Sequence, residues 1–230
     1  MNLYYEILNY FGSAVCHQII ERSLTYKNLT LPLCSRCTGL YFSFLISFIS
    51  CLIVNRKYRY FISKRYVIFG IISIILMGTE VFIEFFNLLS LTNQIRLLTG
   101  LLVGNFLGLI SSEAFLKISS LNLNSKEKSK SVYIFIFWLI LPFFYFIIIN
   151  YLFIKFIGLF FLLATLLISS EILFFSLVIY LFIQSVLPEL IINRKKISLY
   201  STIFIAVFLS ISLLLTLAFL RSHLSLLKIF

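Results

Sequence analysis

Charged side chains are scarce in this 230-residue chain, and acidic ones are the scarcest. Only 12% of the residues are charged, 61% are hydrophobic, and the mean hydropathy is +1.08. A soluble domain has about a quarter of its residues charged and about half of them apolar. Too little polar surface remains here to cover a water-soluble globule. The composition therefore excludes that class and indicates an integral membrane protein.

Three other sequence features are missing. Met1–Gly12 has no basic leader, so we expect no cleavable signal, and the first long apolar run should stay as an anchor. Four cysteines in a chain of this size do not make a disulfide scaffold. The H-E-x-x-H motif is absent, which favours a structural metal site over a catalytic one if metal ligands are found.

The net charge of +11 does not indicate a nucleic-acid partner, because of where the basic residues lie. They form short clusters between apolar runs, and cytoplasmic loops beside membrane spans are enriched in Lys and Arg in this way. We therefore expect membrane lipids as partners and no nucleic acid. Two such clusters are Arg56, Lys57, Arg59, Lys64 and Arg65, and Arg194, Lys195 and Lys196.

Long apolar runs dominate what is present. A membrane span needs roughly 20 mostly apolar residues, and runs that are apolar on every side must be helices. The sequence thus predicts an all-α polytopic transmembrane bundle of about six spans. The fifth run is long and contains Glu171, so we expect it to tilt, break or lie partly in the interface. The six runs are Thr38–Val54, Tyr66–Leu89, Ile95–Leu116, Ser131–Ile154, Phe156–Leu187 and Leu199–Leu220.

Polarity divides the chain into four parts. Residues 1–37 are less apolar than the rest, and Met1–Ile20 has the spacing of an amphipathic interfacial helix. Residues 38–116 hold the first three spans, residues 117–130 form a polar loop, and residues 131–230 hold the last three spans. The loops after the first, third and fifth spans are the most basic, so we predict both termini and residues 1–37 on the extracytoplasmic face.

Glycines recur on the third run. Gly100, Gly104 and Gly108 are spaced four residues apart and form a stripe of small residues on one helix face. Such stripes let two membrane helices approach closely. We assign them packing and no chemistry.

The N-terminal segment carries a pattern of metal ligands. Cys34 and Cys37 are spaced so that two thiolates can bind one ion, and Cys16 or His17 can complete the set. Zinc takes Cys and His in a tetrahedral array. Because Cys16 and His17 are adjacent, three Cys with either His17 or a carboxylate form the less strained set. The pattern predicts a zinc-like site, and a Cys34–Cys37 disulfide and simple helix-end packing are the alternatives.

More polar residues are expected at the same membrane face. The second run ends near Glu84 and the third begins near Arg96, on the face where the first run begins after Cys37. Ionisable groups inside spans are candidates for function. Glu80 and Glu84, one helical turn apart, are candidate catalytic residues, and the alternative is an ion pair that only fixes helix packing. The candidate anion-binding or structural polar residues are Arg22, Arg36, Asn93 and Arg96.

The motifs around these residues resemble a known family. Cys16-His17-Gln18, Arg22-Ser23 and Pro32-x-Cys34-x-Arg36-Cys37-Thr38-Gly39-x-Tyr41 are similar to the pattern of the domain-of-unknown-function family 2085, predicted membrane proteins of bacteria and archaea. Asn93, Arg96, Thr99 and Gly100 match a second motif, whereas Glu80 and Glu84 stand where that family tends to show Asp-Gly-x-x-x-Gln. The resemblance covers roughly residues 11–110. It implies a prokaryotic cell membrane and lends site positions, but no established activity.

Three functions fit these observations. The first is a non-catalytic membrane factor, in which a metal site is structural and docks a protein partner or a lipid headgroup. The second is a metal-dependent membrane enzyme, in which zinc on Cys16, Cys34 and Cys37 polarises a lipid-borne ester or phosphate and Glu80 or Glu84 is the general base. The third is a transporter or channel with Glu80, Glu84 and Glu171 along a polar path, which the lack of a visible repeat disfavours.

Overall fold

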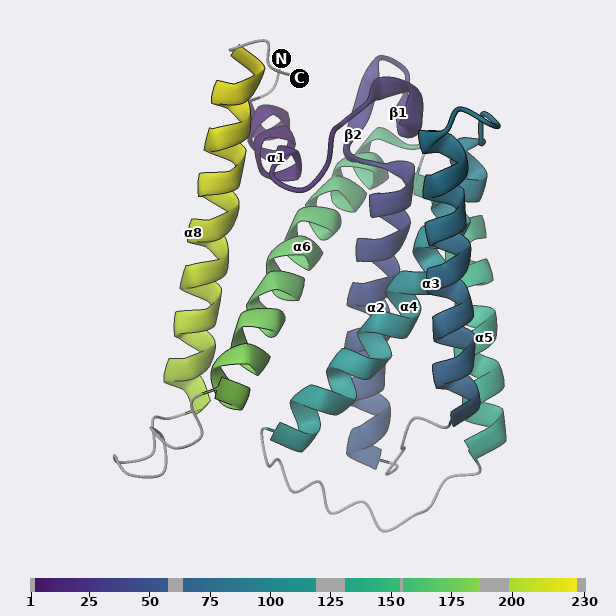
Figure 1. Cartoon of the computed structure of the whole chain (residues 1–230), viewed down its shortest axis with the longest axis vertical. Coiled ribbons are helices and arrows are strands. Elements are labelled where there is room, and N and C mark those ends of the chain that lie inside the picture. Colours follow the sequence, from purple (N-terminus) through teal and green to yellow (C-terminus); the bar gives the residue numbers. More distant parts are fainter. Residues whose placement is uncertain (1–2, 58–63, 119–130, 154, 187–198, 227–230) are drawn as a thin grey trace.

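The computed structural model is a bundle of long helices with a small cap, residues 3–34, at one end (Figure 1). The structure describes residues 3–57, 64–118, 131–153, 155–186 and 199–226. The predicted all-α membrane bundle is confirmed. The helices are α1 (Leu3–Ser13), α2 (Ser35–Lys57), α3 (Lys64–Phe85), α4 (Asn93–Ile118), α5 (Ser131–Ile148), α6 (Ile157–Val186) and α8 (Leu199–Leu226), with a π-helical turn η2 (Ile149–Phe153) directly after α5.

Every predicted apolar run corresponds to a helix. Among the described residues, α2, α3, α4, α6 and α8 are long and apolar enough to cross a membrane, whereas the apolar helix at α5 is shorter, over Ile136–Tyr151. The number of spans, about six, therefore stays a prediction. The long fifth run is one unbroken helix, α6, of 30 residues. At 1.5 Å per residue it measures about 45 Å, more than the roughly 30 Å of hydrocarbon, and it is inclined to α2 in Figure 1.

The glycine stripe brings α2 and α4 into close contact, as predicted. Gly100, Gly104 and Gly108 lie against α2, and a Cβ atom at any of them would collide with a backbone carbonyl oxygen, that of Arg36, Leu40 or Phe44. The hydroxyl of Ser43 in α2 donates to the carbonyl of Leu101 at 2.8 Å, which is possible only because the two backbones are so near. These two helices form the rigid centre on which the cap rests.

The cap differs from the predicted interfacial helix over Met1–Ile20. α1 ends at Ser13, and a coil continues to a single 3₁₀ turn, η1 (Ile20–Arg22). Gln18 interrupts any longer helix because its φ of 51° lies in the left-handed region, which a helix cannot continue through. The buried face of α1 includes Tyr5 and Leu8, and the Tyr5 hydroxyl donates to the Thr30 carbonyl at 2.6 Å.

A short β-hairpin completes the cap. Strand β1 (Ser23–Tyr26) pairs antiparallel with strand β2 (Leu29–Cys34), and Ser23 lies opposite Cys34. β2 leads without a break into α2, so Cys34 is the last residue of a strand and Ser35 the first of a helix. The hairpin thereby fixes the positions of the cysteines relative to the bundle.

The first and last described helices meet at the capped end of the bundle. Figure 1 shows the end of α8, the start of α2, the end of α3 and the start of α4 there, together with α1 and the hairpin. This is the arrangement expected from helices that alternate in direction. Most of the predicted polar loop, residues 119–130, lies outside the described residues.

Candidate metal centre

Three cysteine sulfur atoms meet in the cap. The Sγ atoms of Cys16, Cys34 and Cys37 all lie within 4.8 Å of one another. Two thiolates on one tetrahedral zinc ion are about 3.8 Å apart when each Zn–S bond is about 2.3 Å. The three sulfur atoms, called the sulfur triad below, are therefore close enough to converge on one ion after small side-chain rotations.

The three sulfur atoms come from three different local structures. Cys16 is in the coil after α1, Cys34 ends β2, and Cys37 lies in the first turn of α2. The backbone N–H of Cys34 donates to the Cys16 Sγ at 3.1 Å, so the coil is already joined to the hairpin. The fourth cysteine, Cys51, is 14 residues further along α2, about 21 Å from Cys37, and takes no part.

Two side chains hold the coil that carries Cys16. Gln18 donates from Nε2 to the carbonyl of Asn9 at 2.6 Å and to that of Pro32 at 2.9 Å, which ties α1 to β2. Arg221, near the end of α8, donates from Nη1 to the carbonyls of Ser13 at 2.8 Å and Cys16 at 2.7 Å. The triad is thus assembled by contacts from both ends of the chain.

The triad shares its protons unequally. The hydrogen bond with Cys16, aided by one from Cys37, lowers the pKa of the Cys34 thiol far below its usual value. The hydrogen bond with Cys34 raises the pKa of Cys16. These shifts favour loss of the proton at Cys34 over loss at Cys16. Since metal ligands bind as thiolates, an ion on the triad would displace the thiol protons.

His17 is close to the triad but does not join it in this structure. Its side chain is exposed, and the group of ligand atoms near enough to share an ion consists of the three cysteines alone among the described residues. His17 does line the cavity beside the sulfur atoms. If an ion binds the triad, His17 or another molecule in this cavity is a candidate for its fourth ligand.

The cavity next to the triad has a volume of about 290 Å³. Its lining is partly polar and partly apolar, with three arginine side chains and no Asp or Glu among the lining residues. The lining residues are Val15, Cys16, His17, Gln18, Ile19, Arg22, Cys34, Arg36, Cys37 and Arg96. The candidate anion-binding arginines and the candidate metal ligands thus share one space.

Behind this lining, two buried carboxylates hold the guanidinium groups. Arg36 donates from Nη2 to Glu80 Oε1 at 2.7 Å and to Glu84 Oε2 at 3.2 Å. Arg96 donates from Nε to Glu84 Oε1 at 2.5 Å and also pairs with that oxygen through Nη2. Glu80 and Glu84 are 4% and 8% exposed. Both carboxylates are thus paired with arginines, and their catalytic role stays a prediction.

Asn93 and Thr99 complete this network. Asn93 Oδ1 accepts from Arg96 Nη1 at 2.8 Å, while Asn93 Nδ2 donates to the backbone carbonyl of Glu21 at 3.0 Å. The Thr99 hydroxyl donates to Glu80 Oε2. Asn93 therefore links the start of α4 to η1, which precedes the hairpin. Through Asn93, the network of Arg36, Arg96, Glu80 and Glu84, called the guanidinium–carboxylate cluster below, is joined to the cap that carries the triad.

The structure brings together the predicted site residues but leaves other acidic residues apart. Glu113 pairs with Lys117 on α4, far from the cap, at 2.6 Å. Glu171 is fully buried in α6, and neither of its carboxylate oxygens has a hydrogen-bond partner among the described residues. Neither contributes to the cavity beside the triad.

Sequence reasoning missed the role of three side chains. Gln18 and Thr99 lie inside the two motifs. Their place in the motifs could have indicated that they hold the site residues in position. Arg221 offered no signal, because it lies 205 residues from the carbonyl of Cys16 that it binds.

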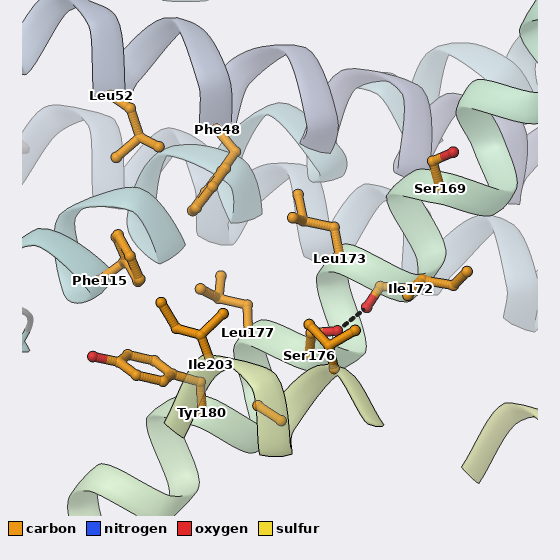
Figure 2. Close-up of a pocket in the computed structure, with 12 residues that line it drawn as sticks. Phe48, Leu52, Phe115, Ser169, Ile172, Leu173, Ser176, Leu177, Tyr180 and Ile203 are labelled. Atoms are coloured by element: carbon orange, nitrogen blue, oxygen red, sulfur yellow. Dashed lines mark hydrogen bonds between the residues drawn. The ribbon is translucent and has the colours of Figure 1, made fainter. Parts of the chain in front are cut away.

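A second cavity, of about 310 Å³, lies between α2, α4, α6 and α8 and is of a different kind (Figure 2). Its lining is almost wholly apolar, with Phe48, Leu52 and Phe115 facing Leu173, Leu177 and Ile203. The polar side chains in its lining are Ser169, Ser176 and Tyr180. It offers no metal ligand and no charge, so the candidate site is the cavity at the cap.

Comparison with known proteins supports the resemblance seen in the motifs. Residues 16–110 match the model of the family DUF2085, described as "Predicted membrane protein". The match begins at Cys16 and ends within α4, so it contains the triad and the guanidinium–carboxylate cluster and leaves out α5, α6 and α8. No curated protein and no solved structure shows a significant match to this chain.

Proposed function

We propose that this membrane protein holds a zinc-like divalent ion on Cys16, Cys34 and Cys37, and that the ion fastens the N-terminal cap to the bundle. The proposal rests on one observation, the convergence of three sulfur atoms from three separate local structures within 4.8 Å. A structural metal contributes directly to folding free energy because its ligands come together only in the folded chain. The fastened cap then serves as a docking site at one membrane face.

The position of the carboxylates favours a docking role over catalysis. A general base must reach the proton that it removes. Glu80 and Glu84 are engaged by Arg36 and Arg96 and are not among the residues that line the cavity. They hold the arginines in position, and no carboxylate among the lining residues is available as a base beside the triad.

A metal-dependent enzyme acting on a lipid-borne substrate is the second candidate. The observation in its favour is the cavity of about 290 Å³ that the three cysteines help to line. Catalytic zinc sites keep one position open. In that case His17, the exposed imidazole in the lining, is the proton acceptor to test in place of Glu80 and Glu84.

Transport has less support. A polar path would have to reach Glu171, and no described side chain hydrogen-bonds to its carboxylate.

The orientation in the membrane is part of the main proposal. With the basic loops inside a prokaryotic cell, the cap lies on the extracytoplasmic face of the cell membrane.

Metal analysis of the detergent-purified full chain tests the metal site. We expect about one zinc ion per chain, loss of the ion in Cys34→Ser, and retention in Cys51→Ser, which removes a cysteine outside the triad. Where Cys34→Ser does not fold, thiol titration of the unmodified chain gives the answer. Three thiols should react only after a chelator is added. Four freely reacting thiols with no bound ion would refute the metal site, and two free thiols without metal would indicate the disulfide.

The same variants separate the two candidate functions. If Cys34→Ser loses both metal and thermal stability, the ion is structural. If the variant stays folded with unchanged stability while an activity on lipid is lost, the protein is an enzyme and the docking role is wrong.

A further inference from the structure

The cavity at the cap is lined by arginine side chains, and the carboxylates that pair with them lie outside its lining. Arg22, Arg36 and Arg96 line it, whereas Glu80 and Glu84, which pair with these arginines, do not. A space surrounded by guanidinium groups and free of carboxylates in its lining favours an anion. The two carboxylates on the far side hold the guanidinium groups in place.

Some donors of these arginines have no acceptor. A guanidinium offers five N–H groups. In Arg36 both ion pairs use Nη2, and Nε is buried without a hydrogen-bond partner among the described residues. The nearest carboxylate oxygen to Arg22 is Glu84 Oε2 at 3.8 Å, beyond hydrogen-bond distance, and the side chain is 43% exposed. The exposed donors of Arg22 have no carboxylate oxygen at hydrogen-bond distance, so an acceptor entering the cavity would be stabilised by them.

We propose that this cavity binds a phosphate group, from the headgroup of an anionic membrane lipid or from free phosphate, through Arg22 and Arg36. The inference rests on the proposed docking function and names the chemistry of what docks. Guanidinium groups bind phosphate oxygens in pairs of parallel hydrogen bonds. A cavity of about 290 Å³ is at the lower limit of ligand pockets, roughly 300–1,000 Å³, and suits a small polar group.

The depth of the cavity matches that of lipid headgroups. It lies where α2 begins and α3 ends, at the capped end of the bundle (Figure 1). Directly after Glu84, the side chains of Phe85, Leu88 and Leu89 are 78%, 64% and 66% exposed. Exposed apolar side chains beside a span end belong at the membrane interface, so the nearby guanidinium groups lie level with the phosphates of the bilayer.

Charge places the phosphate on the arginines and not on the metal. A divalent ion with three thiolates has a formal charge of −1, which disfavours an anion as the fourth ligand. Arg22 and Arg36 carry the positive charge of the cavity. Phosphate binding should therefore depend on these two residues, and metal binding on the triad, so the two can be lost separately.

Binding measurements on the delipidated full chain in detergent test this inference. The probes are inorganic phosphate and dihexanoyl phosphatidylglycerol, a soluble lipid with the phosphate headgroup. Arg22→Gln should lower the affinity for the probe about tenfold or more, because hydrogen bonds between charged groups contribute that much each. Lys27→Gln, which removes one positive charge from the turn of the adjacent hairpin, outside the cavity, should leave the affinity unchanged.

The outcomes are distinct. Equal affinity in Arg22→Gln and the unmodified chain would overturn the inference, and so would an equal loss in Lys27→Gln, which would show only general surface charge. Tight binding of phosphatidylglycerol with weak binding of inorganic phosphate identifies lipid as the source, and the reverse identifies soluble phosphate. Zinc content is measured in the same samples. Absence of zinc with intact, Arg22-dependent phosphate binding would refute the metal site and leave this inference standing.

Discussion

Arg36 of α2 and Glu80 of α3 are joined by a hydrogen bond of 2.7 Å, from Nη2 of the guanidinium to Oε1 of the carboxylate. Both residues are largely withdrawn from solvent, with side chains 19% and 4% exposed. Arg36 is also the residue between Cys34 and Cys37 that lines the cavity. A single side chain therefore connects the sulfur triad to the acidic end of α3.

Loss of one buried carboxylate should strongly destabilise the bundle. Glu84→Gln removes the partner of Arg96 and one of the two partners of Arg36, and leaves their charges under-compensated. Breaking a buried ion pair costs about 3–5 kcal/mol. We expect a clear fall in the thermal unfolding midpoint of the detergent-solubilised chain. Glu113→Gln is the matched control. Its partner Lys117 is 62% exposed, and such pairs contribute about 0.5 kcal/mol or less. Similar midpoints for the two variants would contradict the role given to Glu84.

Acid should remove the metal by protonating its thiolate ligands. A proton competes with the ion for each thiolate, so metal bound by three cysteines should be retained at neutral pH and lost as the pH falls. We expect the metal content after dialysis to fall steeply with decreasing pH, and the thermal stability to fall with it. Metal content that does not change on acidification would show that thiolates are not the ligands.

Arg221 should control the order of the coil that carries Cys16. Arg221→Ala removes two hydrogen bonds to the carbonyls of Ser13 and Cys16, each contributing about 0.5–1.5 kcal/mol or more because the donor is charged. Amide hydrogen exchange in residues 13–18 should become faster, and metal should be lost more rapidly to a chelator. His223→Ala changes an exposed side chain one half-turn further along α8 and should have neither effect. Unchanged exchange in Arg221→Ala would show that the contact does not hold the coil.

The stripe of glycines gives a prediction with opposite signs at two positions. Gly104→Ala places a Cβ against the carbonyl of Leu40 and should destabilise the chain by about 1–3 kcal/mol, as overpacking does. Gly78→Ala, in α3, meets no atom within 4 Å and should stabilise the helix by up to about 1 kcal/mol. Thermal midpoints of the two variants, compared with the unmodified chain, should therefore move in opposite directions.

The convergence of the site was predictable because it follows from the direction of the helices. Apolar runs that alternate in direction place the start of α2, the end of α3 and the start of α4 at one membrane face. Cys37, Glu84 and Arg96 had to lie at that face once the runs were recognised. A close contact of α4 with a neighbouring helix was equally predictable, since glycines four residues apart on a membrane helix are typical of tight helix packing.

The cap was less predictable, and the reasons are physical. β2 contains Pro32, which demotes a sequence as a strand, and the two strands are too short for a reliable alternation of polar and apolar residues. The coil between α1 and η1 includes the left-handed backbone of Gln18, for which Gln has no special preference. The position of His17 depends on that same coil. The adjacency of Cys16 and His17 showed that they would compete for one ion, but not that the imidazole would face the cavity.

The contact between Arg221 and the carbonyl of Cys16 has a consequence for biosynthesis. The three sulfur atoms leave the ribosome early, while the guanidinium that secures Cys16 is made 205 residues after that cysteine. At roughly 5–20 residues per second, about 10 to 40 s separate the two events. During that interval the nascent chain exposes thiols that have not yet been locked in place. Ion capture is thus expected to be completed only after α8 has inserted, as one of the last steps of maturation.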